Sequence, residues 1–182
     1  MRLKKRFMAL AALVGAIAAI STVAFADVAP GTYTPTAGSF NGANAPGSSH
    51  LTSGSPSCTV NADRSISCSA YVLGGVGHTN ADVSLVASYS ATIDCTNKGG
   101  NLVESHTSNF SADSSATVAS TKNGQLSVPA QSVSPFGAPQ VCPNPNWTPS
   151  IRGGTVTLNS FTYTLTFNGF ASAYITIAAT DP

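Results

Sequence analysis

The residues best suited to chemistry in this sequence are four cysteines. They could bind a metal, act as reactive thiols or form disulfides, and they are Cys58, Cys68, Cys95 and Cys142. Zinc sites usually contain two cysteines separated by about two to four residues, and the closest pair here is 10 positions apart. An even number of cysteines in an exported chain favours disulfides. We therefore expect two disulfides and neither a metal nor another cofactor.

Four cysteines can pair in three ways, and the local sequence favours Cys58–Cys68 together with Cys95–Cys142. The stretch SCTVNADRSISCSA fits a hairpin that turns at residues 62–64 and places Cys58 opposite Cys68. Opposed residues on antiparallel strands are about 4.5–5.5 Å apart, which is close to the span of a disulfide. The second disulfide then closes a long loop.

The stretch CTNKGGN, residues 95–101, places a lysine beside two glycines. Backbone N–H groups around glycine can form an anion-binding nest. A phosphate-binding P-loop, however, needs its lysine after the glycines and before a helix. Here Lys98 precedes Gly99 and Gly100, and a strand pattern precedes Lys98. We expect a tight turn whose glycines adopt positive φ, with an anion nest as the alternative.

The histidines and carboxylates lack the spacing of a catalytic or metal site. No second histidine or cysteine lies at metal-ligand spacing from His50, His78 or His106, and the sequence contains no G-x-S-x-G elbow. Asp94 and Glu104 could act as glycosidase-like carboxylates, but the strand pattern turns Asp94 towards solvent. We expect a non-enzymatic protein. The alternative is a secreted hydrolase or metal-binding protein that uses His78, His106, Asp94 or Glu104.

The stretch CPNPNWTPSIRG, residues 142–153, holds the single tryptophan of the sequence on a proline-stiffened loop. The interpretation we favour is that Trp147 covers the Cys95–Cys142 disulfide. An aromatic side chain on a rigid loop can also stack on a sugar or a partner protein. Asn146, Trp147 and Arg152 are therefore the candidate binding surface, for a cell-surface polysaccharide or a protein.

The first 26 residues have the features of a secretory signal peptide. A basic segment at 2–6 is followed by an apolar run to about Ile20 and by the cleavage site Ala24-Phe25-Ala26. The run is shorter than the roughly 20 apolar residues of a membrane anchor. We expect a secreted or cell-envelope protein that starts at Asp27 and has no stable membrane anchor after cleavage.

Removal of this leader reverses the sign of the net charge. The whole chain has 8 Lys+Arg and 7 Asp+Glu, a net of +1, whereas the chain from Asp27 has four bases and a net of −3. The four bases are scattered, and nucleic-acid binding requires clustered ones, so this class of partner is excluded. Such a charge-poor surface could also self-associate through sheet edges.

Alternating polar and apolar residues predict the strands. Residues 82–95, DVSLVASYSATIDC, place apolar side chains at odd positions, and Val86 is the apolar exception at an even one. Residues 115–130 predict two short strands around an Asn123-Gly124 turn. Residues 153–179 predict a second hairpin that turns at Asn168-Gly169, and a change of parity predicts a bulge near Asn159-Ser160.

About seven strands and no convincing helix predict an all-β fold. We expect a two-sheet antiparallel sandwich, Ig-like in general architecture, with two disulfides. Residues 1–26 would be the signal peptide, 27–50 an irregular Pro/Gly/Ser-rich segment and 51–182 the sandwich domain.

The pattern Cys-x-Asn-x-Gly-Gly-Asn at 95–101, followed by Cys142-Pro143 and Trp147, resembles a group of small secreted bacterial proteins of unknown function. The resemblance covers roughly residues 55–180 and implies an exported β-rich domain without implying an activity. Together with the residues above, it leads us to expect a non-enzymatic protein with a structural or binding role.

Overall fold

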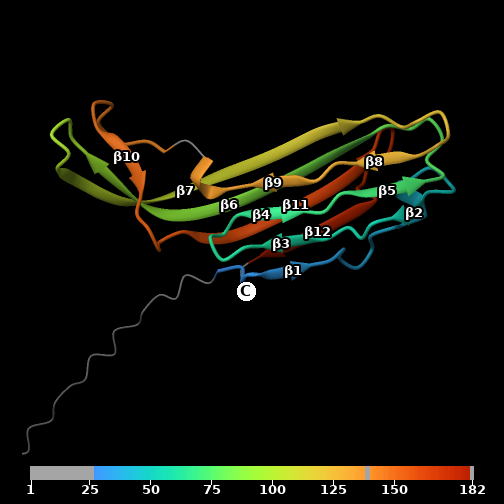
Figure 1. The fold of residues 1–182 in the computed structure, drawn as a ribbon, viewed down its shortest axis with the longest axis horizontal. Coiled ribbons are helices and arrows are strands. Elements are labelled where there is room, and N and C mark those ends of the chain that lie inside the picture. The colour runs from blue at the N-terminus through green and yellow to red at the C-terminus, as the bar shows by residue number, and fades with distance from the viewer. Residues whose placement is uncertain (1–26, 138–139, 181–182) are drawn as a thin grey trace, which may run out of the picture.

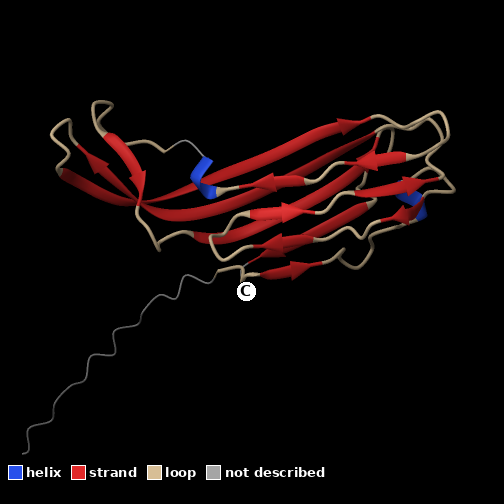
Figure 2. Cartoon of the chain, viewed as in Figure 1, coloured by secondary structure: helices blue, strands red, loops and turns tan. Residues whose placement is uncertain are grey.

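The computed structural model describes residues 27–137 and 140–180, so the expected signal peptide lies outside the described residues. Within these ranges the chain is built from β-strands and two short 3-10 turns, η1 (Gly42–Asn44) and η2 (Pro135–Gly137). The strands form antiparallel sheets arranged in two layers (Figures 1 and 2). The predicted all-β antiparallel fold with two disulfides is confirmed.

The first layer is organised around one long strand, β6 (Ala81–Thr96). It pairs along one edge with β7 (Leu102–Val118), and its other edge is shared by β11 (Thr157–Phe167) and β10 (Thr148–Ile151). The layer is completed by β12 (Ile175–Thr180), which pairs with β11. As predicted, the odd positions of β6 are buried, whereas Val86 is 45% exposed.

The second layer consists of two short sheets that lie end to end (Figure 1). One has the order β1-β3-β4-β9 and the other β2-β5-β8. Their bounds are β1 (Gly31–Tyr33), β2 (His50–Ser53), β3 (Cys58–Val60), β4 (Ile66–Cys68), β5 (Tyr71–Gly74), β8 (Leu126–Val128) and β9 (Gln131–Val133).

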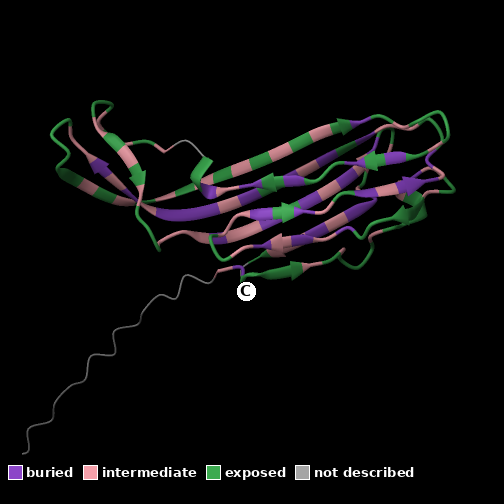
Figure 3. Cartoon of the chain, viewed as in Figure 1, coloured by how far each residue is buried: buried purple, intermediate pink, exposed green. Residues whose placement is uncertain are grey.

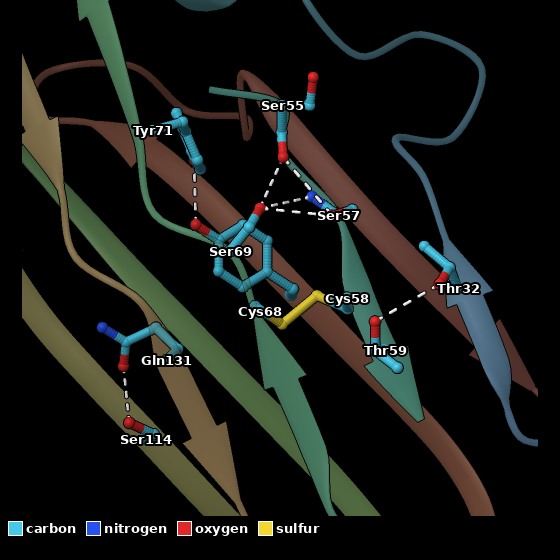
Figure 4. Close-up of a disulfide and its surroundings, with 11 residues drawn as sticks. Thr32, Ser55, Ser57, Cys58, Thr59, Cys68, Ser69, Tyr71, Ser114 and Gln131 are labelled. Carbon is cyan, nitrogen blue, oxygen red and sulfur yellow. Dashed lines mark hydrogen bonds between the residues drawn. A yellow bond between two sulfur atoms is a disulfide. The ribbon is translucent and has the colours of Figure 1, made fainter. Parts of the chain in front are cut away.

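Serine side chains replace ladder hydrogen bonds where the second layer is interrupted. The Ser69 hydroxyl donates to the Ser55 carbonyl at 2.6 Å and accepts from the Ser57 N–H at 3.0 Å. Figure 4 shows this cluster beside the Cys58–Cys68 disulfide, which joins directly opposed residues of β3 and β4. The predicted hairpin and its cross-link are both confirmed.

The core lies between the two layers (Figure 3). Tyr71 of β5 and Tyr163 of β11 are both buried, and their hydroxyls are hydrogen-bonded to each other at 3.0 Å across the layers. A second contact joins the layers between β7 and β9, where the Ser114 hydroxyl donates to the Gln131 side-chain carbonyl at 2.6 Å. Polar contacts thus fix the two layers relative to each other.

The outer face of the first layer is rich in hydroxyl groups and also carries aspartates, among them Asp82 and Asp113. Register places Thr164, Ser84 and Ser115 in one row across β11, β6 and β7, and Ser160, Ser88 and Ser111 in another. This is the polar face that the alternation of β6 predicts.

The predicted β11–β12 hairpin and its bulge are confirmed, because the pairing of β11 with β6 shifts between Leu158 and Ser160. The prediction of a hairpin around Asn123-Gly124 is wrong, because the two flanking strands do not pair with each other. The turn is present, with a Gly124 N–H to Thr121 carbonyl hydrogen bond of 3.0 Å, but it connects two layers. The strand before it pairs with β6 and the strand after it with β5.

Candidate functional site: an arm that holds Trp147

The first layer continues beyond the sandwich as an arm (Figure 1). We define the arm as residues 91–96 of β6, residues 102–108 of β7, and β10 with the loop 140–147 that precedes it. In the arm, Thr148 of β10 lies opposite Thr96 of β6, and Ile151 lies opposite Ile93. Among the described strands, none forms a second sheet over the arm. Other contacts must therefore hold the arm together.

A small apolar cluster and the second disulfide hold the arm together. Ala91, Ile93 and Cys95 are buried, and Cys142, Trp147 and Ile151 are among the partly buried residues that pack against them. The Cys95–Cys142 disulfide joins residues 47 positions apart, with Cα atoms 5.9 Å from each other. Trp147 therefore packs on the cluster that contains the disulfide, as the covering interpretation requires.

An ion pair fixes the opposite face of the arm. The Arg152 guanidinium donates to both oxygens of Asp94, from Nη2 to Oδ1 at 2.6 Å and from Nε to Oδ2 at 3.1 Å. The Ser105 hydroxyl also donates to Asp94, at 2.7 Å, and accepts from Arg152. The hydrogen bonds from Arg152, and then that from Ser105, lower the pKa of Asp94.

The three residues of the predicted binding surface are therefore not brought together. Arg152 bonds to Asp94, which the alternation of β6 places on the face opposite Cys95. Trp147 packs on the Cys95 face. Asn146 is exposed beside it, and its backbone N–H donates to Asn144 Oδ1 at 2.9 Å. Asn146 and Trp147 remain neighbours in one loop, whereas Arg152 has a positioning role within the sheet.

The CTNKGGN stretch forms the turn between β6 and β7. Asn97 Oδ1 accepts from the Gly99 N–H at 2.9 Å and from the Asn101 N–H at 3.1 Å. The Asn97 carbonyl accepts from the Gly100 N–H at 2.9 Å, and Gly100 has a φ of 76°. Because these N–H groups are already satisfied within the turn, they do not point at an anion. The structure thus shows the predicted tight turn, in which Gly100 but not Gly99 adopts positive φ.

The acid–base residues are distributed between the two ends of the molecule. His106 and Glu104 lie on the same face of β7 in the arm, with Nδ1 and Oε1 3.6 Å apart. His50 lies in β2 and His78 in the β5–β6 connection, towards the other end (Figure 1). In the described part of the chain, no three His, Cys, Asp or Glu residues are placed to hold a metal ion. Glu104 and His106 are thus the one acid–base pair among the residues named for the hydrolase alternative.

The proline-rich loop before β10 borders a hollow of about 270 Å³. Its wall includes the Trp147 side chain, Pro145, Pro149 and Val141, with Asn144 and the Cys142 end of the disulfide beside them. None of the lining residues is charged. The sequence signal for this hollow is the spacing of prolines and asparagines around the single tryptophan.

Comparison with known protein families, with curated proteins and with solved structures found no match. The two short 3-10 turns are the helical elements of the described ranges, and neither approaches the length or apolarity needed to span a bilayer. Any functional conclusion therefore depends on the sequence and the geometry of this chain.

Proposed function

We propose that this protein is a secreted or cell-envelope-associated, non-enzymatic binding protein that contacts its partner through the arm, at Trp147 and the adjoining loop. The observation behind this proposal is the position of Trp147, which lies beside an open hollow on a projecting arm that a disulfide and an ion pair make rigid. Rigid display of an aromatic side chain lowers the entropy lost on binding, and aromatic residues are enriched at binding hot spots.

Export is supported by two features. The predicted leader at residues 1–26 has the three parts of a signal peptide. Both disulfides are formed and no described cysteine is free, and disulfides persist in oxidising compartments. The resemblance to small secreted bacterial proteins agrees with this location.

A non-enzymatic role is supported by the way the ionisable groups of the arm are used. Asp94 accepts three hydrogen bonds from Arg152 and Ser105, so its carboxylate is engaged in holding strands together. The hydrolase alternative would have to depend on Glu104 and His106. That alternative would be favoured if the purified protein hydrolysed a substrate and if Glu104→Gln or His106→Ala abolished this activity.

The binding role can be tested by sedimentation with insoluble cell-envelope material. We expect the exported protein to sediment with the envelope and Trp147→Ala to remain in the supernatant. Phe136→Ala is a matched control, because Phe136 is also aromatic and is 60% exposed, but lies in η2 outside the arm. Equal sedimentation of the wild type and Trp147→Ala would refute the proposal.

A further inference from the structure

We infer that the hollow beside Trp147 binds one or two rings of a neutral glycan. This inference depends on the proposed binding role of the arm and adds the chemical class of the ligand. It starts from the composition of the wall, where the indole and the rings of Pro145 and Pro149 supply rigid apolar surface. Small-molecule sites combine such surface with a few oriented polar groups, and the C–H faces of a sugar ring match it.

The polar side chains of the hollow, Trp147, Asn144 and Gln140, carry no charge and include hydrogen-bond donors. The indole N–H of Trp147 has no acceptor among the described residues, although a buried or half-buried indole usually finds one. Asn144 Oδ1 accepts the Asn146 N–H at 2.9 Å, which fixes the orientation of the amide and leaves its NH₂ group available. Neutral donors beside an apolar wall fit the hydroxyl, ring and acetamido oxygens of a glycan.

The absence of charge in the lining argues against ionic ligands. Burying a phosphate or carboxylate without a positive partner is unfavourable, and the nearest arginine of the arm, Arg152, is bound to Asp94 on the other face. The hollow therefore suits a neutral ligand better than a phosphorylated or acidic one.

The edge of β10 also argues against an extended peptide. The Arg152 N–H donates to the Thr92 carbonyl of β6 at 2.8 Å. Because the direction of the N–H groups alternates along an antiparallel ladder, the nitrogen of Pro149 lies on the edge that faces away from β6. Proline has no N–H to donate, so this edge is protected against strand addition. A sugar ring, by contrast, can bind without backbone hydrogen bonds to a strand edge.

The size of the hollow sets the expected strength of binding. Its volume of about 270 Å³ is just below the range of about 300–1,000 Å³ that is usual for small-molecule sites. It has room for one or two sugar rings, and the remaining rings of a longer oligosaccharide would lie in solvent. Affinity for a short glycan should therefore be weak, because one hollow of this size buries little ligand surface.

The test uses Trp147 as its own reporter, because it is the single tryptophan of the sequence. The exported protein is titrated with chitotetraose, cellotetraose, an oligogalacturonate and a proline-rich peptide while tryptophan emission is recorded. We expect a saturable change with at least one of the two neutral oligosaccharides and none with the charged oligosaccharide or the peptide. No change with either neutral oligosaccharide, or saturation by the peptide, would overturn the inference.

Variants show whether the binding depends on the hollow. By calorimetry, Trp147→Ala should weaken the interaction about tenfold or more, as expected for a hot-spot aromatic. Trp147→Phe should weaken it less, since it keeps an aromatic face, and Phe136→Ala should leave it unchanged. Equal affinity of Trp147→Ala and the wild type for the neutral oligosaccharide would also overturn the inference. Thermal unfolding of each variant shows whether it is folded.

The two proposals fail in different ways. If envelope sedimentation requires Trp147 but no neutral oligosaccharide binds, the glycan inference fails and the binding role stands. If sedimentation persists after protease treatment of the envelope and is competed by the oligosaccharide, both are supported. If sedimentation does not depend on Trp147, the proposed function itself fails.

Discussion

Arg152 of the arm donates to both carboxylate oxygens of Asp94, at 2.6 Å and 3.1 Å, and so connects the end of β10 to β6 across 58 positions of sequence. Together with the Cys95–Cys142 disulfide on the other face, this contact explains how a four-residue strand with one neighbour keeps its place. The Trp147 loop is thus fixed by contacts on both faces of a single sheet layer.

We predict that Asp94→Asn loosens β10 while leaving the sandwich intact, because it removes the charge that attracts Arg152. Hydrogen exchange followed by NMR should show faster exchange of the Arg152 and Ser150 amides, with little change in core strands. Asp113→Asn is the matched control, since Asp113 is an exposed aspartate of β7. Unchanged exchange at Arg152 would show that the ion pair does not hold the strand.

The same ion pair predicts a dependence on acidic pH. The pKa of Asp94 is lower in the folded chain than the unfolded value of about 3.9. Its contribution to stability is therefore complete above that value and is lost as the pH falls through the lower, folded pKa. An NMR titration of the Asp94 carboxyl carbon should give a midpoint below about 3.9. A midpoint at or above this value would contradict the hydrogen-bonded geometry.

We predict that the Cys95→Ala, Cys142→Ala double variant loses about 4 kcal/mol of unfolding free energy, from the chain-entropy estimate for its long loop. Trp147 emission should shift towards that of exposed tryptophan, because the cluster beneath the indole loses its cross-link. The Cys58→Ala, Cys68→Ala variant should leave the emission of the folded protein unchanged, since that disulfide belongs to the core between the layers. Denaturant unfolding followed by fluorescence measures both effects. An unshifted emission in the first variant would show that the disulfide does not position Trp147.

We predict a loss of stability at alkaline pH that depends on the buried tyrosine pair. Burial raises the pKa of Tyr163 to about 12, whereas an unfolded tyrosine titrates near 10. The stabilising contribution is therefore complete below pH of about 10 and is lost as the pH rises towards the folded pKa. Denaturant unfolding from pH 8 upwards, with tyrosinate absorbance, measures this decline.

Tyr163→Phe is the variant that tests this assignment. It should lower stability at neutral pH by about 1–3 kcal/mol, because the Tyr71 hydroxyl loses its buried partner. It should also make the alkaline decline shallower. An equally steep decline in this variant would show that Tyr163 is not responsible.

The fold could be predicted from sequence wherever alternation was unambiguous. The apolar residues at odd positions of β6 predicted its buried face. The switch of apolar residues from even positions, at Leu158, to odd positions, at Phe161, predicted the bulge at Asn159. Residues 102–114 of β7 were missed, because this segment is rich in serine and threonine and has few large apolar side chains. Pairing with β6, rather than its own pattern, makes this segment a strand.

The candidate site was predicted only in part, because its geometry depends on contacts distant in sequence. The loop around Trp147 was recognised from its prolines, and Cys142 was paired correctly with Cys95. The partner of Arg152 could not be predicted, since nothing local indicates that β10 lies beside β6. The Asn123-Gly124 turn shows the same limit, because a turn does not specify whether its flanking strands share a sheet.

The rows of serine and threonine across β6, β7 and β11 determine how this face of the protein responds to changes in pH and salt concentration. Hydroxyls have no proton to gain or lose between mildly acid and mildly alkaline conditions, and dissolved ions do not screen them. The hydration of these hydroxyl rows should therefore stay constant when salinity or acidity changes, whereas the aspartates of the same face, such as Asp82 and Asp113, should respond.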